Sequence, residues 1–129
     1  MSEIIKYFKL YKKIKKPKYT PLGYEIYSPV NLKLKAGEPY LVPLGFKMSF
    51  PKTYCCLLTK NKCRVLGGLI DSDCRGEIRA ILCPKEDIFI KRNTIIVVMQ
   101  ILEIDLPVIK ENKSNSFIQV GSEVFKINK

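Results

Sequence analysis

The residues best able to carry out chemistry lie in one short segment, GGLIDSDCRGE at residues 67–77. The segment surrounds Asp71 with glycines, the residue type that a tight hairpin needs. Taken alone, this string favours a turn in which Asp71 bonds its own backbone. The chain contains no histidine, so Ser-His-Asp and Cys-His catalysis are excluded. Acid–base chemistry near neutral pH would have to use carboxylates, lysines, tyrosines or cysteines.

The cysteines favour a reducing compartment. There are 5 of them, Cys55, Cys56, Cys63, Cys74 and Cys83, and no two form a C-x-x-C pair. An odd count, no histidine and no secretory signal argue for reduced thiols that fill apolar space rather than for disulfides or zinc. No segment is long and apolar enough to cross a bilayer. We therefore expect an intracellular protein, in the cytoplasm or nucleus, with no membrane partner.

The formal net charge is +11, and lysines cluster early in the chain, at Lys12, Lys13, Lys15, Lys16 and Lys18. Such a run favours an anionic partner, for example a nucleotide, a nucleic acid or an acidic protein. It is equally compatible with a solvated lysine-rich surface, because no aromatic or arginine pattern accompanies the run. Charge-driven binding of nucleic acid is one open function for this chain.

Short strands are the elements that must position these residues. A chain of 129 residues suffices for one domain, and its 47% apolar content predicts a packed core. Short β-rich runs occupy residues 32–34, 40–42, 46–50, 54–58, 77–82, 88–90 and 95–104, with turn signals between them. This spacing is typical of a sandwich, jelly roll or small barrel. The polar stretch KENKSNS, at residues 110–116, marks the expected boundary between two parts of the chain. These are a β domain at residues 1–109 and a C-terminal arm at residues 110–129.

Three stretches resemble motifs of the trimeric dUTPase family. GLIDSDCRGE at residues 68–77 matches the third motif, G-[VL]-I-D-x-D-Y-R-G-E, at all but one position. PLGYEIYS at residues 21–28 is similar to the first motif, A-G-Y-D-L-Y-S, and residues 37–48 resemble the stretch P-G-E-…-L-V-P-T-G-L-K-M. The resemblance implies an all-β domain of the dUTPase-like β-clip or distorted jelly-roll barrel type. It also implies a homotrimer in which the arm packs on a neighbouring subunit, and the apolar run at residues 95–104 favours burial between subunits.

The resemblance also implies roles for particular residues. Members of this family hydrolyse dUTP to dUMP and pyrophosphate, with Mg²⁺ bound to the triphosphate. Asp71 would be the carboxylate that activates water, and Glu25 would help to organise Mg²⁺ through water. No cofactor is expected beyond Mg²⁺, and that only when nucleotide is bound. A nucleotide-binding role is implied for a set of hairpin residues: Gly67, Gly68, Leu69, Ile70, Cys74 and Arg75.

Several positions depart from the family pattern. Cys74 replaces the tyrosine that packs under the deoxyribose, and Glu25 carries one methylene more than the aspartate of the first motif. The second motif, Y-G-R-I-A-P-R-S-G-L-A, is several residues too short at residues 54–63. The fourth motif loses its glycine, aspartate and arginine at residues 93–100, and the glycine-rich fifth motif has no counterpart at residues 114–122.

These departures predict a degenerate active site on a retained scaffold, because residues that handle triphosphate are lost while those that build the fold persist. The leading interpretation is a non-catalytic interaction or regulatory module with a protein partner that the sequence does not identify. The alternatives are a weak or active dUTP pyrophosphatase and a nucleotide-binding protein. The family resemblance is compatible with a viral origin, in which case the protein would act inside a virus-infected host cell.

Overall fold

The computed structural model describes residues 5–105 and 107–112, and these residues contain strands and turns but no helix. This confirms the all-β prediction. Twelve strands follow in chain order. They are β1 (Lys6–Lys9), β2 (Lys18–Thr20), β3 (Gly23–Tyr27), β4 (Leu32–Leu34), β5 (Tyr40–Pro43), β6 (Phe46–Ser49), β7 (Tyr54–Lys60), β8 (Arg64–Leu66), β9 (Leu69–Ile70), β10 (Arg79–Cys83), β11 (Ile88–Ile90) and β12 (Ile95–Glu103).

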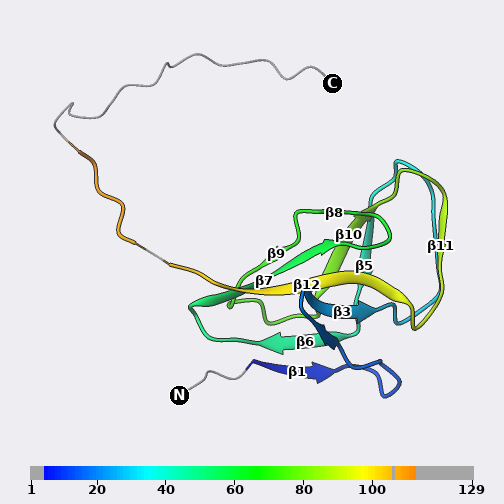
Figure 1. Ribbon diagram of the computed structural model, residues 1–129, viewed down its shortest axis with the longest axis horizontal. Coiled ribbons are helices and arrows are strands. Elements are labelled where there is room, and N and C mark those ends of the chain that lie inside the picture. The colour runs from blue at the N-terminus through cyan, green and yellow to red at the C-terminus, as the bar shows by residue number, and fades with distance from the viewer. Residues whose placement is uncertain (1–4, 106, 113–129) are drawn as a thin grey trace, which may run out of the picture.

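The longest strand, β12, is the centre of a five-stranded sheet with the order β2-β3-β12-β7-β9. It runs through the middle of the body in Figure 1 and pairs antiparallel with β3 on one side and β7 on the other. A bulge between Ile95 and Val97 breaks the register with β3, and Ile96 at the bulge is fully buried. A strand paired on both sides and packed on the core is expected to be apolar. The apolar run therefore does not by itself require a second subunit.

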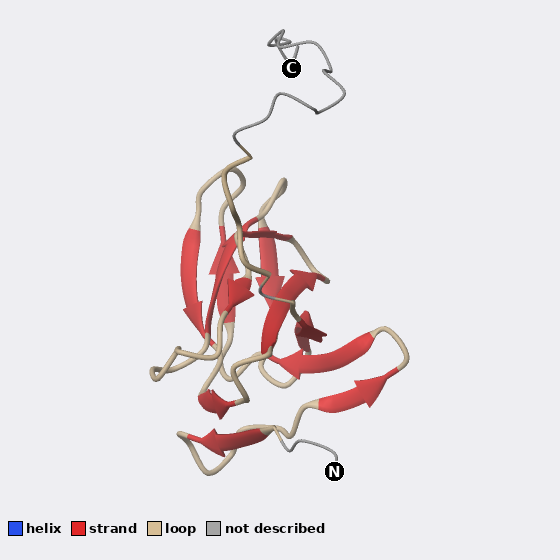
Figure 2. Cartoon of the chain, turned by 90° about the vertical axis from the view of Figure 1, so that its left-hand side faces the viewer, coloured by secondary structure: helices blue, strands red, loops and turns tan. Residues whose placement is uncertain are grey.

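Smaller sheets complete the body around this central sheet (Figure 2). Their strand orders are β5-β10-β8, β1-β6 and β11-β4, and all pairs are antiparallel. Their inward side chains form one hydrophobic core with those of β3, β7 and β12. The turn at Gly45, whose φ is 87°, joins β5 to β6 and holds Ile14 of the β1–β2 connection against it. The architecture is thus all-β, with four antiparallel sheets around one core, as the motifs imply.

All seven predicted strands are present, and five further strands, β1, β2, β3, β8 and β9, were not predicted. β1 and β2 are lysine-containing and largely exposed, and β8 and β9 have three and two residues. β1, β8 and β9 pair with strands that are distant in sequence, whereas β2 forms a hairpin with β3. β10 also begins at Arg79, later than predicted, because Glu77 and Ile78 bond the β5–β6 turn instead of joining the sheet.

After β12 the chain leaves the body, and residues 107–112 are exposed (Figure 1). Val108 and Ile109 expose 81% and 94% of their surface. Most of the predicted arm at residues 110–129 lies outside the described residues, so its packing on a neighbouring subunit stays a prediction. No helix in the described part of the chain could span a membrane.

Candidate functional site

The hairpin at residues 67–75 begins at two glycines that turn the chain from β8 into β9. Gly67 and Gly68 have φ values of 69° and 89°, a region that favours glycine. The carbonyl of Gly68 accepts the Leu58 N–H at 2.8 Å, and Ile70 pairs with Cys56. Because β9 is the last strand in its sheet, its outer edge has no strand partner among the described residues. The hairpin thus presents backbone groups that could pair with a flat ligand such as a base.

Asp71 lies at the first position after β9 and is exposed. Its Oδ1 accepts the Asp73 N–H at 2.9 Å, and its carbonyl accepts the Cys74 N–H at 3.3 Å. This is a turn in which the aspartate side chain bonds the backbone two residues further on. The reading of Asp71 as a turn residue is therefore correct for the isolated chain, and its role as a base stays a prediction.

Cys74 is half-buried and packs against the hydrophobic core. Its thiol lies close enough to Cys56 of β7 to influence that group electrostatically. Burial, then the neighbouring Cys55 and Cys74 thiols, raise the pKa of Cys56 to about 12. The side chain that replaces the family's tyrosine is thus directed to the sheet instead of outward under a sugar.

Arg75, the last of the predicted nucleotide-binding residues, bonds its own loop. Its Nη1 donates to the Ser72 carbonyl at 2.7 Å, while the side chain remains exposed. Leu69 exposes 66% of its surface and Ile70 is half-buried against the core. The hairpin residues are therefore together in space, and the polar side chains of Asp71 and Arg75 bond the turn itself.

Glu25, the predicted Mg²⁺ residue, does not lie near this hairpin within one chain. It is in β3, three strands away from β9 in the sheet order, and is displaced from Ile70 by three residues along β12. Ordinary sheet spacings put their Cα atoms about 18 Å apart. The described residues also contain no group of three or more Cys, Asp or Glu able to hold a metal ion. The role of Glu25 toward Mg²⁺ therefore stays a prediction.

The region of the shortened second motif is a tight connection. Residues 61–63 link β7 directly to β8, and no helical turn follows β7. Lys60, Lys62 and Arg64 line a hollow of about 250 Å³ there, but Glu86 and Asp87 line it too. Residues 67–75 line none of five hollows on the described part of the chain. Positive charge is present near the motif without a helix N-terminus that could hold phosphates.

A sequence model of the dUTPase family matches residues 11–126. The chain belongs to the dUTPase family. Solved structures agree on the fold, and two dUTPases of Staphylococcus phages are among them. A mutant of the phage 80alpha enzyme has a TM-score of 0.80 at 20% identity, over 97% of this chain and 98% of that one. A mutant of the phage phi11 enzyme has a TM-score of 0.76 at 16% identity, over 88% and 99%.

A viral dUTPase gives the same result. The EIAV enzyme has a TM-score of 0.73 at 18% identity, covering 88% of this chain and all of that chain. At these identities the likeness shows the fold only. No curated protein sequence matches the chain. In this dUTPase-family protein the predicted roles of Asp71, Glu25 and the hairpin residues accordingly rest on motif position.

Glu77, in the third motif, has a structural role that the sequence did not reveal. Glu77 Oε2 accepts the Gly45 N–H at 2.8 Å, and the neighbouring Ile78 exchanges hydrogen bonds with Leu44 and Phe46. These contacts tie the end of the hairpin loop to the β5–β6 turn. Only the pairing of two distant motif stretches, residues 37–48 and 68–77, could have indicated this contact.

The buried thiol of Cys56 predicts a loss of stability at high pH. Its pKa is raised from 9.0 to about 12 by burial, so the unfolded chain releases this proton at lower pH than the folded chain. The contribution is fully present below pH 9 and is lost as the pH rises toward 12. Between pH 8 and pH 10 it should amount to about 1 kcal/mol of unfolding free energy.

Urea denaturation at several pH values would measure this effect. The Cys56→Ala variant is the control, because it removes this thiol while the other ionisable groups remain. The difference in unfolding free energy between the two proteins should shrink as the pH rises above 9. Parallel pH profiles for the two proteins would contradict the prediction.

Proposed function

We propose that this protein is a dUTPase-family member that no longer hydrolyses dUTP efficiently and acts as a non-catalytic interaction or regulatory module. The observation that carries the proposal is the tight connection at residues 61–63, which replaces the phosphate-binding stretch of the second motif. Phosphoryl chemistry depends on positioning and on neutralising phosphate charge. A chain that has lost the element that positions the phosphates should keep its fold but hydrolyse dUTP much more slowly.

The hairpin geometry supports the same conclusion. Cys74 packs inward against the core, and the Arg75 guanidinium bonds the Ser72 carbonyl. Neither side chain is arranged to hold a sugar or a phosphate in the isolated chain. The Asp71 carboxylate bonds the Asp73 N–H, which orients it within its own turn. A catalytic site that has decayed would keep the backbone of the hairpin while its side chains take other contacts.

A regulatory role on this fold has a parallel among the solved structures. The dUTPase of Staphylococcus bacteriophage 80alpha, which has a TM-score of 0.75 at 19% identity, is named for controlling transfer of virulence genes by a proto-oncogenic G protein-like mechanism. We propose for the present protein an unidentified protein partner inside a cell. All 5 cysteines are free and four are buried, in keeping with a reducing compartment such as cytoplasm or nucleus.

We further propose a homotrimer, as in the family that the motifs indicate. Glu25 and the hairpin lie about 18 Å apart in one chain at ordinary sheet spacings, so a site that contains both needs more than one subunit. Leu69 on β9 and Val108 and Ile109 beyond β12 are exposed apolar side chains suited to burial between subunits. Multi-angle light scattering at micromolar concentration should give about 45 kDa, three times the 14.9 kDa chain. A mass of one chain would contradict the trimer.

Nucleotide binding without hydrolysis is the second candidate function, because the backbone edge of β9 and the glycine turn before it are retained. Since Cys74 supplies no ring beneath a sugar, we expect the site not to distinguish deoxyribose from ribose. Isothermal titration with Mg²⁺ should give dUMP and UMP affinities that agree within about threefold, less than the roughly fivefold that an aromatic contact of about 1 kcal/mol would supply.

The matched variant for this experiment is Cys74→Tyr. If it gains a preference for dUMP, the alignment of Cys74 with the family's tyrosine is supported. A strong preference for dUMP in the unmodified protein would contradict the prediction. Absence of any nucleotide binding in both proteins would leave the interaction module as the better function and eliminate nucleotide binding.

A further inference from the structure

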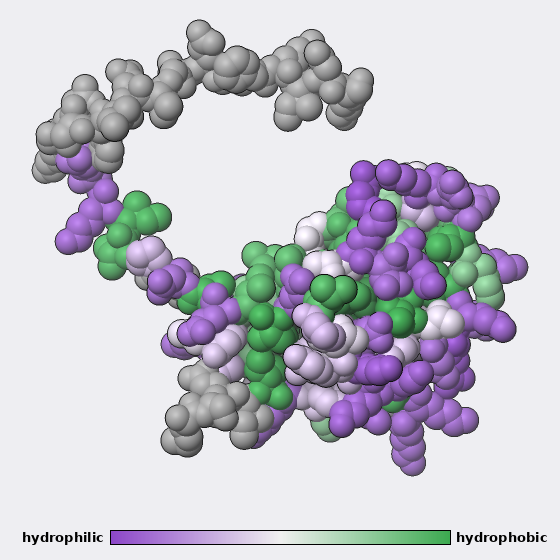
Figure 3. Space-filling model, viewed as in Figure 1, coloured by the Kyte–Doolittle hydropathy of each residue, from purple (hydrophilic) through white to green (hydrophobic). Residues whose placement is uncertain are grey.

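The lysine run meets three tyrosines in the folded chain, which its sequence alone did not indicate. The five lysines at residues 12–18 are all exposed; four lie in the connection from β1 to β2, and Lys18 begins β2. Ile14 in their midst is buried and touches Gly45, so the connection is fixed to the body. Figure 3 shows hydrophilic residues gathered on the side of the body where this connection lies. The charges are therefore held on one surface.

The tyrosines come from β2 and β3. Lys15 Nζ lies 4.1 Å from the ring centroid of Tyr27, a cation–π contact. Tyr19 and Tyr24 are cross-strand partners whose rings meet edge to face, with centroids 5.7 Å apart. Tyr19 still exposes 70% of its surface, whereas Tyr27 is buried. The ring of Tyr19 thus packs against Tyr24 and remains open to solvent near the lysines.

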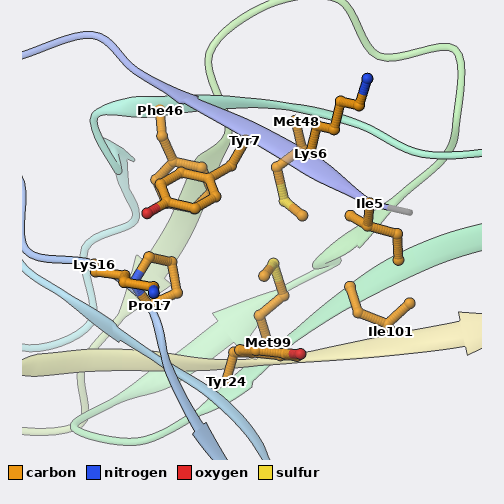
Figure 4. Close-up of a pocket in the computed structure, with 10 residues that line it drawn as sticks. All are labelled: Ile5, Lys6, Tyr7, Lys16, Pro17, Tyr24, Phe46, Met48, Met99 and Ile101. Carbon is orange, nitrogen blue, oxygen red and sulfur yellow. The ribbon is translucent and has the colours of Figure 1, made fainter.

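These residues line a common hollow of about 770 Å³ that is open to solvent. Its lining defines what we call the lysine–tyrosine surface: Lys15, Lys16, Pro17, Lys18, Tyr19, Tyr24 and Tyr27. An apolar pocket of about 190 Å³ adjoins it and shares Lys16, Pro17 and Tyr24; Figure 4 shows Lys16 and Pro17 at one end of this pocket. Glu25, which is in register with Lys18, is the nearby acidic group and does not line the hollow.

We propose that the lysine–tyrosine surface binds single-stranded nucleic acid. Lysines attract the phosphate backbone, and an exposed ring offers a face on which an unpaired base can stack. A duplex keeps its bases stacked inside and cannot use Tyr19 in this way. An acidic peptide would need the charges but not the open ring.

Within one chain this surface lies apart from the hairpin at residues 67–75. β2 and β9 are the two opposite edge strands of the five-stranded sheet. The inference therefore does not rest on the proposed function, and loss of dUTP hydrolysis leaves it unaffected. It accounts for the lysine run and for Tyr19, which lie outside the dUTPase motifs.

Fluorescence anisotropy of the full chain with a labelled 20-nucleotide oligo-dT, an oligo-rU of equal length and a duplex would test the proposal. Both single strands should bind at 50 mM salt, and the duplex should bind at least about tenfold more weakly, because base stacking supplies part of the affinity. A stronger affinity for oligo-rU would identify RNA as the ligand, and an equal or stronger affinity for oligo-dT would identify DNA. Equal binding of duplex and single strands, or no binding of either, would overturn the proposal.

Two pairs of variants separate stacking from charge. Tyr19→Ala should lower single-strand affinity about tenfold, while Tyr19→Phe should retain it, as expected for one stacked base. Phe89→Ala is the matched control, because Phe89 exposes 53% of its surface on β11, away from the lysine–tyrosine surface. An unchanged affinity in Tyr19→Ala, or an equal loss in Phe89→Ala, would refute stacking on Tyr19.

For charge, the double variant Lys15→Gln/Lys16→Gln should reduce the slope of log affinity against log salt by about 1.4, at about 0.7 for each phosphate contact. The control Lys33→Gln/Lys35→Gln removes the same charge from a different exposed surface and should leave the slope unchanged. Equal reductions in both double variants would show diffuse attraction to net charge and would contradict a defined binding surface.

Discussion

Purified protein should release pyrophosphate from dUTP at least about 10³-fold more slowly than an intact dUTPase assayed beside it. Removing even one group that stabilises transition-state charge lowers kcat by about 10²–10³-fold. Here the connection at residues 61–63 lacks a helical turn for the phosphates, and Arg75 bonds the Ser72 carbonyl. The substitution of aspartate by glutamate at Glu25 adds a displacement that catalytic sites tolerate poorly. The measurement is a coupled pyrophosphate assay with excess Mg²⁺.

The control for this assay is Asp71→Asn, which keeps the shape of the side chain and removes its basicity. If the residual rate is background, it should be the same in Asp71→Asn and in the unmodified protein. Turnover comparable to that of the intact enzyme, abolished in Asp71→Asn, would show that Asp71 works as the base. That result would contradict the proposed non-catalytic role and restore dUTP pyrophosphatase as the function.

Substitution of Gly68 should have the largest effect on stability among the hairpin positions. A Cβ on Gly68 would lie 2.5 Å from the Leu58 carbonyl oxygen, a backbone atom that cannot move without breaking the pairing of β9 with β7. Its φ of 89° adds strain for any other residue. We expect Gly68→Ala to lower the unfolding free energy by about 3–4 kcal/mol, combining backbone strain of 1–2 kcal/mol with overpacking.

Gly67 provides a control one residue away. Its φ of 69° also favours glycine, but a Cβ there would have nothing within 4 Å. Gly67→Ala should therefore cost only about 1–2 kcal/mol, the strain of the left-handed conformation. Urea denaturation followed by circular dichroism would compare the two variants. Equal destabilisation would show that the contact with Leu58 does not restrict the hairpin.

The sequence by itself determined the all-β class, the turn at Asp71 and the family resemblance. These features depend on residues that are neighbours in the chain. Alternating apolar residues and Gly/Pro turns predict short strands, and the string at residues 68–77 carries its hairpin conformation locally. The shortness of the second motif is likewise a local feature, because chain length limits what can form between β7 and β8.

Tertiary structure decided which distant residues these local features contact. The inward packing of Cys74 depends on β9 pairing with β7, which places Cys56 behind the hairpin. The distance between Glu25 and the hairpin follows from a strand order that no local pattern encodes. In the same way, packing of Ile14 against Gly45 fixes the lysine run to the body. Contacts between residues far apart in the chain depend on which strands pair, and strand pairing is settled only when the whole core is buried together.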